Sequence, residues 1–296
     1  MSAPLPVGRS PIAHGRLRSV ATKPGVAIGL CLLGVFVFAA AFPGLLSPND
    51  PLVSAPEGLS ASGRPLPPGT VGFPLGTDEL GRDQLSRLVY ATRGALLIAI
   101  VPNAVALSIA TIVGVVAGYF RGWVEVVLMR VTETVLVLPA FLVTLAILAT
   151  FGRSVEALVI TLALVAWPYP ARVVYGEVLR IREETFVEAA RSIGASPLRI
   201  IGLHVAPQLR GLLLVYFTLN AVFMVLLEAG LSFLGFGTPP PDPTWGAMLA
   251  SSRDQFLSPW LIISPGLCLA LLGAGFYLVG DGIQSALGPP RARIRL

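Results

Sequence analysis

The chain has 296 residues, of which 54% are hydrophobic and only 12% are charged, with a mean hydropathy of +0.79 and a net charge of +5 at pH 7. Soluble domains carry about 25% charged residues, so this chain has too little polar surface to cover a globule in water. The composition excludes an ordinary soluble protein and favours one that faces lipid. Because the basic residues border apolar runs, membrane orientation explains the positive charge better than nucleic-acid binding does.

The N-terminal region combines a tail, an apolar run and a polar loop. Residues 1–24 are rich in Pro, Gly and Arg and are expected to form a cytoplasmic tail. The apolar run at 26–46 predicts a retained membrane anchor. A cleaved signal peptide is the alternative, because residues 39–41 loosely resemble a cleavage site, but the run is longer than a usual signal core. Residues 25–93 are therefore expected to hold the first transmembrane helix and an external loop.

Five further apolar runs are each near or above the length of about 20 residues that crosses a bilayer as a helix. We expect membrane spans at residues 95–119, 131–151, 157–175, 211–231 and 260–279. They define a core transmembrane domain, residues 94–280, which precedes a second cytoplasmic tail at 281–296. Pro168 and Pro170 predict a bend near the end of the fourth span. The predicted fold class is all-α, a polytopic membrane protein with six transmembrane helices.

The distribution of Lys and Arg predicts the orientation. An N-terminus on the inner side places most of the 21 basic residues inside, above all in the loop at 176–210, as the positive-inside rule requires. Both termini are then cytoplasmic, and the protein is a multi-pass component of the cytoplasmic membrane. Arg82, Arg87 and Arg93 run against the rule, and the acidic residues beside them are expected to offset their charge.

Residues that could carry catalysis or hold a metal are scarce. A phosphate-binding P-loop ends in Gly-Lys-Ser/Thr, whereas the single lysine, Lys23, is followed by proline. The two histidines, His14 and His204, form neither an HExxH pair nor a credible catalytic triad. We expect no enzyme activity and no metal site in this chain. A partner or an ion gradient would have to supply any energy for transport.

Gradient-driven transport would require ionisable residues within the spans. Glu133 and Glu228 are the candidates, and both fall near predicted span ends, where an interfacial or interhelical carboxylate is the plainer interpretation. A self-sufficient secondary transporter that uses them remains an alternative, as does a membrane enzyme or scaffold. Gly114 and Gly118 have GxxxG spacing, which weakly indicates close helix packing.

The most informative segment lies between the fourth and fifth spans. Thr185 and Glu188 have the spacing of a capping box, which predicts the start of a short helix, and Gly194 suits the left-handed residue that ends it. Ser196-Pro197 then predicts the first residues of a second helix.

Pro207 is expected to limit that second helix. Two short helices with a sharp break, exposed to the cytoplasm, suit a docking element that passes rigid-body motion from a partner to the adjacent spans.

A motif in this segment resembles a known family. Glu188-Ala189-Ala190, three further residues and Gly194 are similar to the EAA motif of binding-protein-dependent ABC import permeases. In that family nine residues, a hydrophobic or His position, one residue and Leu-Pro follow, and here nine residues lead to His204-Val205-Ala206-Pro207. Ala206 departs from the usual Leu, and His204 matches the peptide/nickel branch.

Further stretches narrow the resemblance to the DppC/OppC-type permease subunit of the dipeptide/oligopeptide/nickel ABC importer family. Residues 76–87 look like the segment before its second span. Residues 231–237, together with Trp245-Gly246, resemble the loop before its last span, and Gly280-Asp281-Gly282 matches its ending. The likeness covers roughly residues 70–290.

This resemblance implies a type I ABC importer fold, with the EAA loop at 183–207 as a cytoplasmic coupling helix pair. It implies a second homologous permease in a heterodimer, two ABC ATPase subunits, an extracytoplasmic substrate-binding protein and the membrane lipid as partners, and no nucleic acid. ATP and Mg would be bound by the ATPases, with no cofactor in this chain. Peptides are favoured as substrates because no span resembles a metal site, and nickel or another small solute is the alternative.

The residues carried over as the ATPase-coupling contact are Glu188, Ala189, Ala190, Arg191, Gly194, Ala195, Ser196, Pro197, His204 and Pro207.

Overall fold

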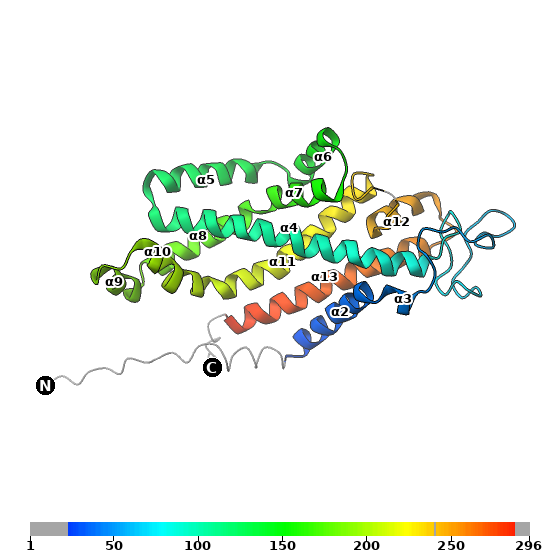
Figure 1. Ribbon diagram of the computed structural model, residues 1–296, viewed down its shortest axis with the longest axis horizontal. Helices are drawn as coiled ribbons and strands as arrows, with labels where there is room; N and C mark the ends of the chain where they lie inside the picture. Colours follow the sequence, from blue (N-terminus) through cyan, green and yellow to red (C-terminus); the bar gives the residue numbers. More distant parts are fainter. Residues whose placement is uncertain (1–22, 240, 288–296) are drawn as a thin grey trace, which may run out of the picture.

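The computed structural model describes residues 23–239 and 241–287. In these ranges the regular structure is helical, and strand-like pairing is confined to four isolated bridges between residues 54 and 83. Five helical stretches are long and apolar enough to cross a membrane, and one bent pair of helices supplies a sixth. Figure 1 shows the long helices running along the long axis of the molecule, which confirms the prediction of an all-α polytopic protein.

The first span, α2 (Pro24–Ala41), is followed by the short helix α3 (Pro43–Leu46). Helix α2 packs along α13 (Trp260–Leu287) at the other end of the chain. Gly29 permits this close approach, because a Cβ atom there would lie 2.9 Å from the carbonyl oxygen of Gly275. The first span is thus built into the bundle.

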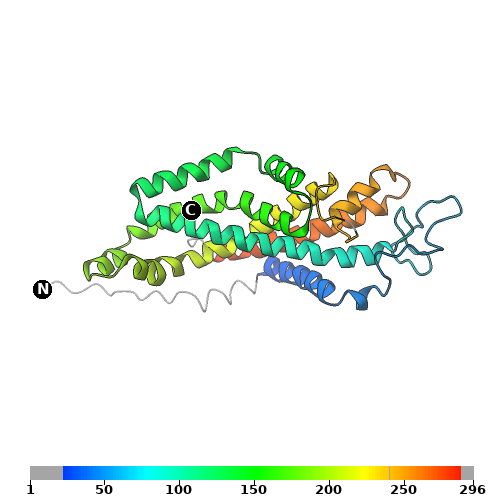
Figure 2. The same cartoon turned by 45° about the horizontal axis from the view of Figure 1, so that its top comes forward.

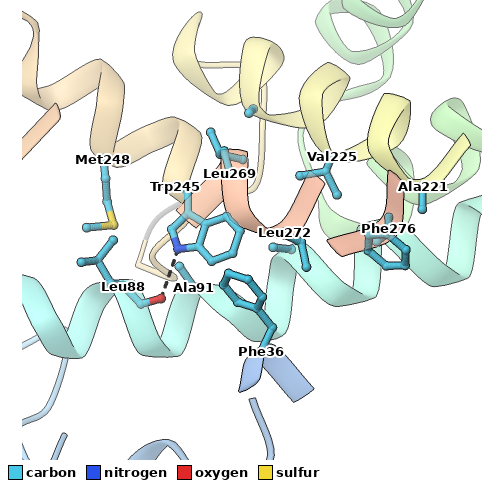
Figure 3. Close-up of a cluster of buried hydrophobic side chains, with 13 residues drawn as sticks. Phe36, Leu88, Ala91, Ala221, Val225, Trp245, Met248, Leu269, Leu272 and Phe276 are labelled. Atoms are coloured by element: carbon cyan, nitrogen blue, oxygen red, sulfur yellow. Dashed lines mark hydrogen bonds between the residues drawn. The ribbon is translucent and has the colours of Figure 1, made fainter. Parts of the chain in front are cut away.

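A buried apolar core joins α2 and α13 to α4 (Gln84–Phe120), α11 (Ala206–Phe233) and the short helix α12 (Trp245–Ser251). At its centre, the indole of Trp245 donates to the carbonyl oxygen of Leu88 at 3.1 Å and meets the ring of Phe36 at a centroid distance of 5.7 Å (Figure 3). The indole N–H therefore keeps a partner although the side chain is buried. These five helices share one core.

The third span differs from the prediction of one helix over 131–151. It consists of α5 (Gly122–Val137) and α6 (Ala140–Phe151), which meet at 85°. Pro139 causes the break, because it has no N–H to donate and forces Leu138 into an extended conformation with φ −77° and ψ 130°. Figure 2 shows α5 at the periphery of the bundle, beside α8 (Pro168–Arg182) and on the side away from α2.

The fourth span is interrupted at Trp167, between α7 (Val155–Ala166) and α8, directly before Pro168, where the sequence predicted a bend. Helix α8 packs closely against α4 through the two glycines of the GxxxG spacing. A Cβ atom at Gly114 would lie 2.8 Å from that of Val174, and one at Gly118 would lie 2.9 Å from that of Val178. The expected close helix packing is confirmed.

The loop before α4 supplies a carboxylate for two of the three arginines that run against the positive-inside rule. Asp78 accepts from Arg82 at 2.7 Å and from Arg87 at 3.2 Å, as the sequence predicted for these two residues. Arg93 instead donates to the carbonyl oxygen of Ala40 at 2.7 Å. An acidic residue therefore pairs with two of the three arginines.

The start of α4 is fixed by Asp83, whose carboxylate accepts the backbone N–H groups of Leu85 and Ser86. The same carboxylate accepts from Ser47 and Asn49, each at 3.2 Å. This bonding ties the end of the first span to the second and begins the helix well before residue 95, where the apolar run starts. At the other end of the chain α13 continues to Leu287, so the boundary expected at 280 falls inside a helix.

Candidate coupling site

The first helix of the candidate site is α9 (Thr185–Ser192), which follows α8 almost directly. The predicted capping box is wrong, because Glu184 takes the N-cap position and Thr185 lies inside the first turn. The carbonyl oxygen of Glu184 accepts the N–H groups of Val187 and Glu188 at 2.9 and 3.2 Å. The carboxylate of Glu184 makes no cap bond and pairs instead with Arg180 at 2.7 Å, near the end of α8.

Helix α9 is followed by a break at Gly194, which has φ +79° and is the left-handed glycine that the sequence predicted. The N–H of Ala195 donates to the carbonyl of Ala190 at 3.1 Å, and that of Gly194 donates to the carbonyl of Arg191 at 2.9 Å. These two bonds form a Schellman motif, which closes a helix and turns the chain sharply. Ala195 packs against the apolar cluster that contains Ala190, as the motif commonly requires.

The second helix, α10 (Pro197–Ile200), begins at the predicted residues, with Ser196 at the N-cap and Pro197 first. It does not end before Pro207. A π-helical turn, η1 (Ile201–Val205), joins it to α11, and the N–H of Ala206 donates to the carbonyl of Ile201. Proline lacks an N–H and its ring disturbs the preceding helical turn, and the wider π turn accommodates it without a break. The second helix of the hairpin is therefore continuous with the fifth span.

We call residues 185–207 the coupling hairpin. Its inner side is buried on the ends of three spans, through Val187, Ala190, Ile200 and Val205. The same apolar cluster contains residues from α4, α8 and α11, namely Val115, Tyr119, Val174, Val178, Ile181 and Leu209. A displacement of the hairpin therefore has to move these helix ends with it.

Two arginines strengthen the junction with α4. The Nη1 atom of Arg182 donates to the carbonyl oxygen of Tyr119 at 2.9 Å. The guanidinium of Arg191 lies over the ring of the same tyrosine, 5.4 Å from its centroid. Arg191, one of the motif residues, thus contacts the protein's own α4 as well as facing solvent.

The outer side of the coupling hairpin is exposed and partly apolar. Ile193 and Leu198 are 85% and 78% exposed. The motif residues on this side are Glu188, Ala189, Arg191, Gly194, Ser196, Pro197 and Pro207. Ile193 and Leu198 were not in the predicted set, although large apolar residues beside a helix-ending glycine could have indicated them.

The motif residues thus divide into two groups. Ala190 is buried, and Ala195 and His204 are half-buried, with the His204 ring 6.2 Å from that of Phe186. These three residues hold the hairpin together, whereas the exposed group presents a surface. The sequence pattern did not separate these roles.

The two carboxylates considered for ion coupling lie in different surroundings. Glu228 is buried and accepts from the hydroxyl of Ser232 on the same helix. Glu133 is half-exposed on α5 and pairs with Arg130 at 3.3 Å. Within residues 23–239 and 241–287, no three His, Cys, Asp or Glu side chains group as they would around a metal ion.

Comparison with known proteins gives consistent results. Residues 110–293 match the family described as "Binding-protein-dependent transport system inner membrane component". The chain is 37% identical to the glutathione transport system permease protein GsiD of Pectobacterium atrosepticum over 73% of this chain and 72% of that protein. It is 36% identical to the di/tripeptide transport system permease protein DppC of Pseudomonas aeruginosa over 92% and 90%.

A solved structure, the MetNI methionine ABC transporter in inward-facing conformations, matches with a TM-score of 0.58 and 18% identity. The match covers 68% of this chain and 97% of that chain, and it shows a type I ABC importer fold. The family match covers more than half of the chain, and the DppC relative matches nearly all of it. The chain therefore belongs to the binding-protein-dependent transport system inner membrane components, as a DppC/OppC-type permease subunit of an ABC importer.

Proposed function

We propose that this chain is the membrane-spanning subunit of an importer that moves di- and oligopeptides across the cytoplasmic membrane, driven by ATPase subunits in trans. The observation that carries the proposal is the coupling hairpin, whose inner side is buried on α4, α8 and α11 while its outer side is exposed. Relatives named for glutathione and for di- and tripeptides support peptides as the substrate class.

The coupling hairpin faces the cytoplasm in this proposal, as do both termini. The excess of Lys and Arg at the hairpin and in the N-terminal tail supports this orientation. Helix α2 begins beside the end of α13, since a Cβ atom at Gly25 would lie 3.9 Å from a side-chain atom of Leu278. In Figure 1 these two helix ends point away from the loop at 47–83, toward the hairpin.

Two ATPase subunits, which would bind ATP and Mg, dock on the coupling hairpins of this chain and of a second homologous permease. The contact on this chain is the exposed group, with Glu188 and Arg191 offering charges of both signs around apolar Ile193 and Leu198. A small apolar centre with a polar rim is typical of protein interfaces. Closure of the ATPases pushes the hairpin, and the buried cluster passes the motion to three spans.

Replacement of Gly194 by valine tests this coupling. A Cβ atom at Gly194 would meet nothing within 4 Å, so the cost is conformational and about 1–2 kcal/mol for a left-handed residue. Gly202→Val is the matched control, because that position is equally open and has no positive φ. The complete importer, with its ATPases, second permease and binding protein, is reconstituted in vesicles, and ATP-dependent peptide uptake is measured.

We expect Gly194→Val to lower peptide uptake at least tenfold while the protein still inserts in the membrane, and Gly202→Val to keep it within about threefold. Full uptake by Gly194→Val would contradict the coupling role. Uptake of nickel in place of peptides would contradict the substrate class and leave the coupling role intact. Uptake by this chain alone in response to an ion gradient would contradict the whole proposal.

A further inference from the structure

A cavity lies where the third span breaks, at the 85° bend between α5 and α6. We call it the elbow cavity. Its volume is about 520 Å³, within the range of about 300–1,000 Å³ that small-molecule sites occupy. Residues from the bend, from the α7–α8 junction and from α11 line it, among them Pro139, Val165, Tyr169, Tyr216, Asn220 and Phe223.

The elbow cavity combines two features, non-helical backbone and polar side chains within the membrane-spanning region. Non-helical backbone at membrane depth occurs where it is buried in protein or lines a cavity, and here Leu138 and Pro139 do the latter. Polar side chains in membrane segments commonly mark the path of a substrate. Both features meet at this one place.

An amide pair supplies the polar group of the elbow cavity. Asn103 on α4 is fully buried and donates to the carbonyl oxygen of Phe217 at 2.7 Å. Its own oxygen accepts from the amide nitrogen of Asn220 at 2.9 Å. An asparagine side chain has two N–H donors and one acceptor oxygen, so this contact leaves Asn220 an oxygen and an N–H for the cavity. That combination matches the C=O and N–H groups of a peptide bond.

Two tyrosines form the aromatic part of the wall. The rings of Tyr169 on α8 and Tyr216 on α11 lie 6.1 Å apart at their centroids. Tyrosine offers an apolar face and a polar tip, so it contacts side chains of different chemistry without selecting one. Such a wall suits a class of substrates that share a backbone and differ in their side chains.

A second hollow, of about 760 Å³, lies farther along α5 and α8. Residues 121–133, from the α4–α5 turn and the part of α5 before the elbow, line this hollow. Residues 172–176 on α8 line it as well. Its charged lining carries both signs, from Arg121, Glu125, Arg130, Glu133 and Arg172. A cleft of one sign would concentrate ions of the opposite sign, whereas a mixed lining suits a zwitterion.

Resting on the proposed function, we infer that the elbow cavity is where a peptide in transit contacts this chain. Asn220 forms hydrogen bonds with the peptide backbone, and Tyr169 and Tyr216 limit the width of the peptide that can pass. The hollow along α5 and α8 is the continuation of the path toward the cytoplasm.

Filling the elbow cavity tests the inference. Val165 lines the cavity, and its neighbour Leu164 on the same turn is 50% exposed and does not. Val165→Trp and Leu164→Trp therefore place the same side chain at the same depth on two faces of α7. The complete importer carrying either change is reconstituted in vesicles, and uptake of glycylglycine and of a bulky tripeptide is measured beside the ATP hydrolysis that the loaded binding protein stimulates.

We expect Val165→Trp to lower tripeptide uptake at least tenfold and glycylglycine uptake less than threefold, with ATP hydrolysis within twofold of the unmodified importer. Leu164→Trp should leave all three within twofold. Equal uptake by the two variants for both peptides would overturn the inference and leave the proposed function standing. Absence of peptide uptake by the unmodified importer would overturn the proposed function itself.

Two further variants, neither of which adds a tryptophan, test the inference if Val165→Trp does not fold. Tyr169 is 61% exposed, and Tyr169→Ala should raise the ratio of tripeptide to glycylglycine uptake at least threefold. Asn220→Leu keeps the branched shape of the side chain and removes the amide, and it should lower uptake of both peptides at least fivefold with ATP hydrolysis retained. An unchanged ratio in the first variant together with unchanged uptake in the second would overturn the inference.

Discussion

The two ends of the molecule are built on opposite principles. At one end, the loop at 47–83 buries a paired carboxylate, because Asp78 is 3% exposed and pairs with Arg82 and Arg87. At the other end, the coupling hairpin buries one apolar side and leaves Ile193 and Leu198 in solvent. The loop also exposes an apolar side chain, Val71, so the difference lies in what holds each end together: buried ion pairs in the loop, and apolar burial on three spans in the coupling hairpin.

Backbone packing reinforces this contrast. A Cβ atom at Gly58 would lie 2.1 Å from the carbonyl oxygen of Gly81, so the loop at 47–83 has no room at that point. At Gly194 and Gly202 in the coupling hairpin a Cβ atom would meet nothing within 4 Å. Substitution of Gly58 should therefore damage the fold, whereas Gly202 tolerates a side chain and Gly194 is constrained only by its positive φ.

The largest effect is expected from Asp78→Ala. It leaves Arg87, which is 6% exposed, without its carboxylate, and breaking a buried ion pair in this way costs about 3–5 kcal/mol. Asp50→Ala is the matched control, because Asp50 is exposed and accepts a single bond, from the N–H of Leu52 at 2.8 Å. Its loss should cost no more than about 1 kcal/mol. Thermal unfolding in detergent measures both, and equal midpoints would contradict the closed bonding of the loop.

The smallest effect on the fold is expected from Ile193→Ser combined with Leu198→Ser. Exposed substitutions usually change stability by no more than about 0.5 kcal/mol, so the unfolding midpoint should stay close to that of the unmodified protein. Co-purification of the ATPase subunits should fall at least fivefold, because these side chains form the apolar centre of the proposed contact. Unchanged co-purification would remove Ile193 and Leu198 from that contact.

Much of the fold can be predicted from local sequence patterns that do not depend on contacts with distant residues. Apolar runs of sufficient length mark the spans, and the turn at Gly194 follows from a residue that tolerates positive φ. The elbow at Pro139 was missed because an apolar composition continues across it, and lipid-facing residues look alike in a straight or a bent helix. The helix end expected at Pro207 was wrong for another reason, because a π turn accommodates the proline and the helix continues.

The candidate sites were predictable to different degrees. The coupling hairpin is continuous in sequence, so its motif could be read directly, although the burial of Ala190 and exposure of Ala189 depend on the spans beneath it. The elbow cavity joins residues as distant as Pro139 and Asn220, and the bond from Asn220 to Asn103 forms only when α4 packs against α11. Contacts between residues so far apart in the chain leave no periodic pattern in a single sequence.

The orientation of the two ends provides the most direct test. In a protein with Cys31→Ala and Cys268→Ala, a cysteine is placed at Ile193 in the coupling hairpin or at Val71, which is 96% exposed in the opposite loop. A membrane-impermeant thiol reagent is then applied to right-side-out and inverted membrane vesicles. Labelling at position 193 in inverted vesicles and at position 71 in right-side-out vesicles is expected. Labelling of position 193 in right-side-out vesicles would contradict a cytoplasmic coupling hairpin.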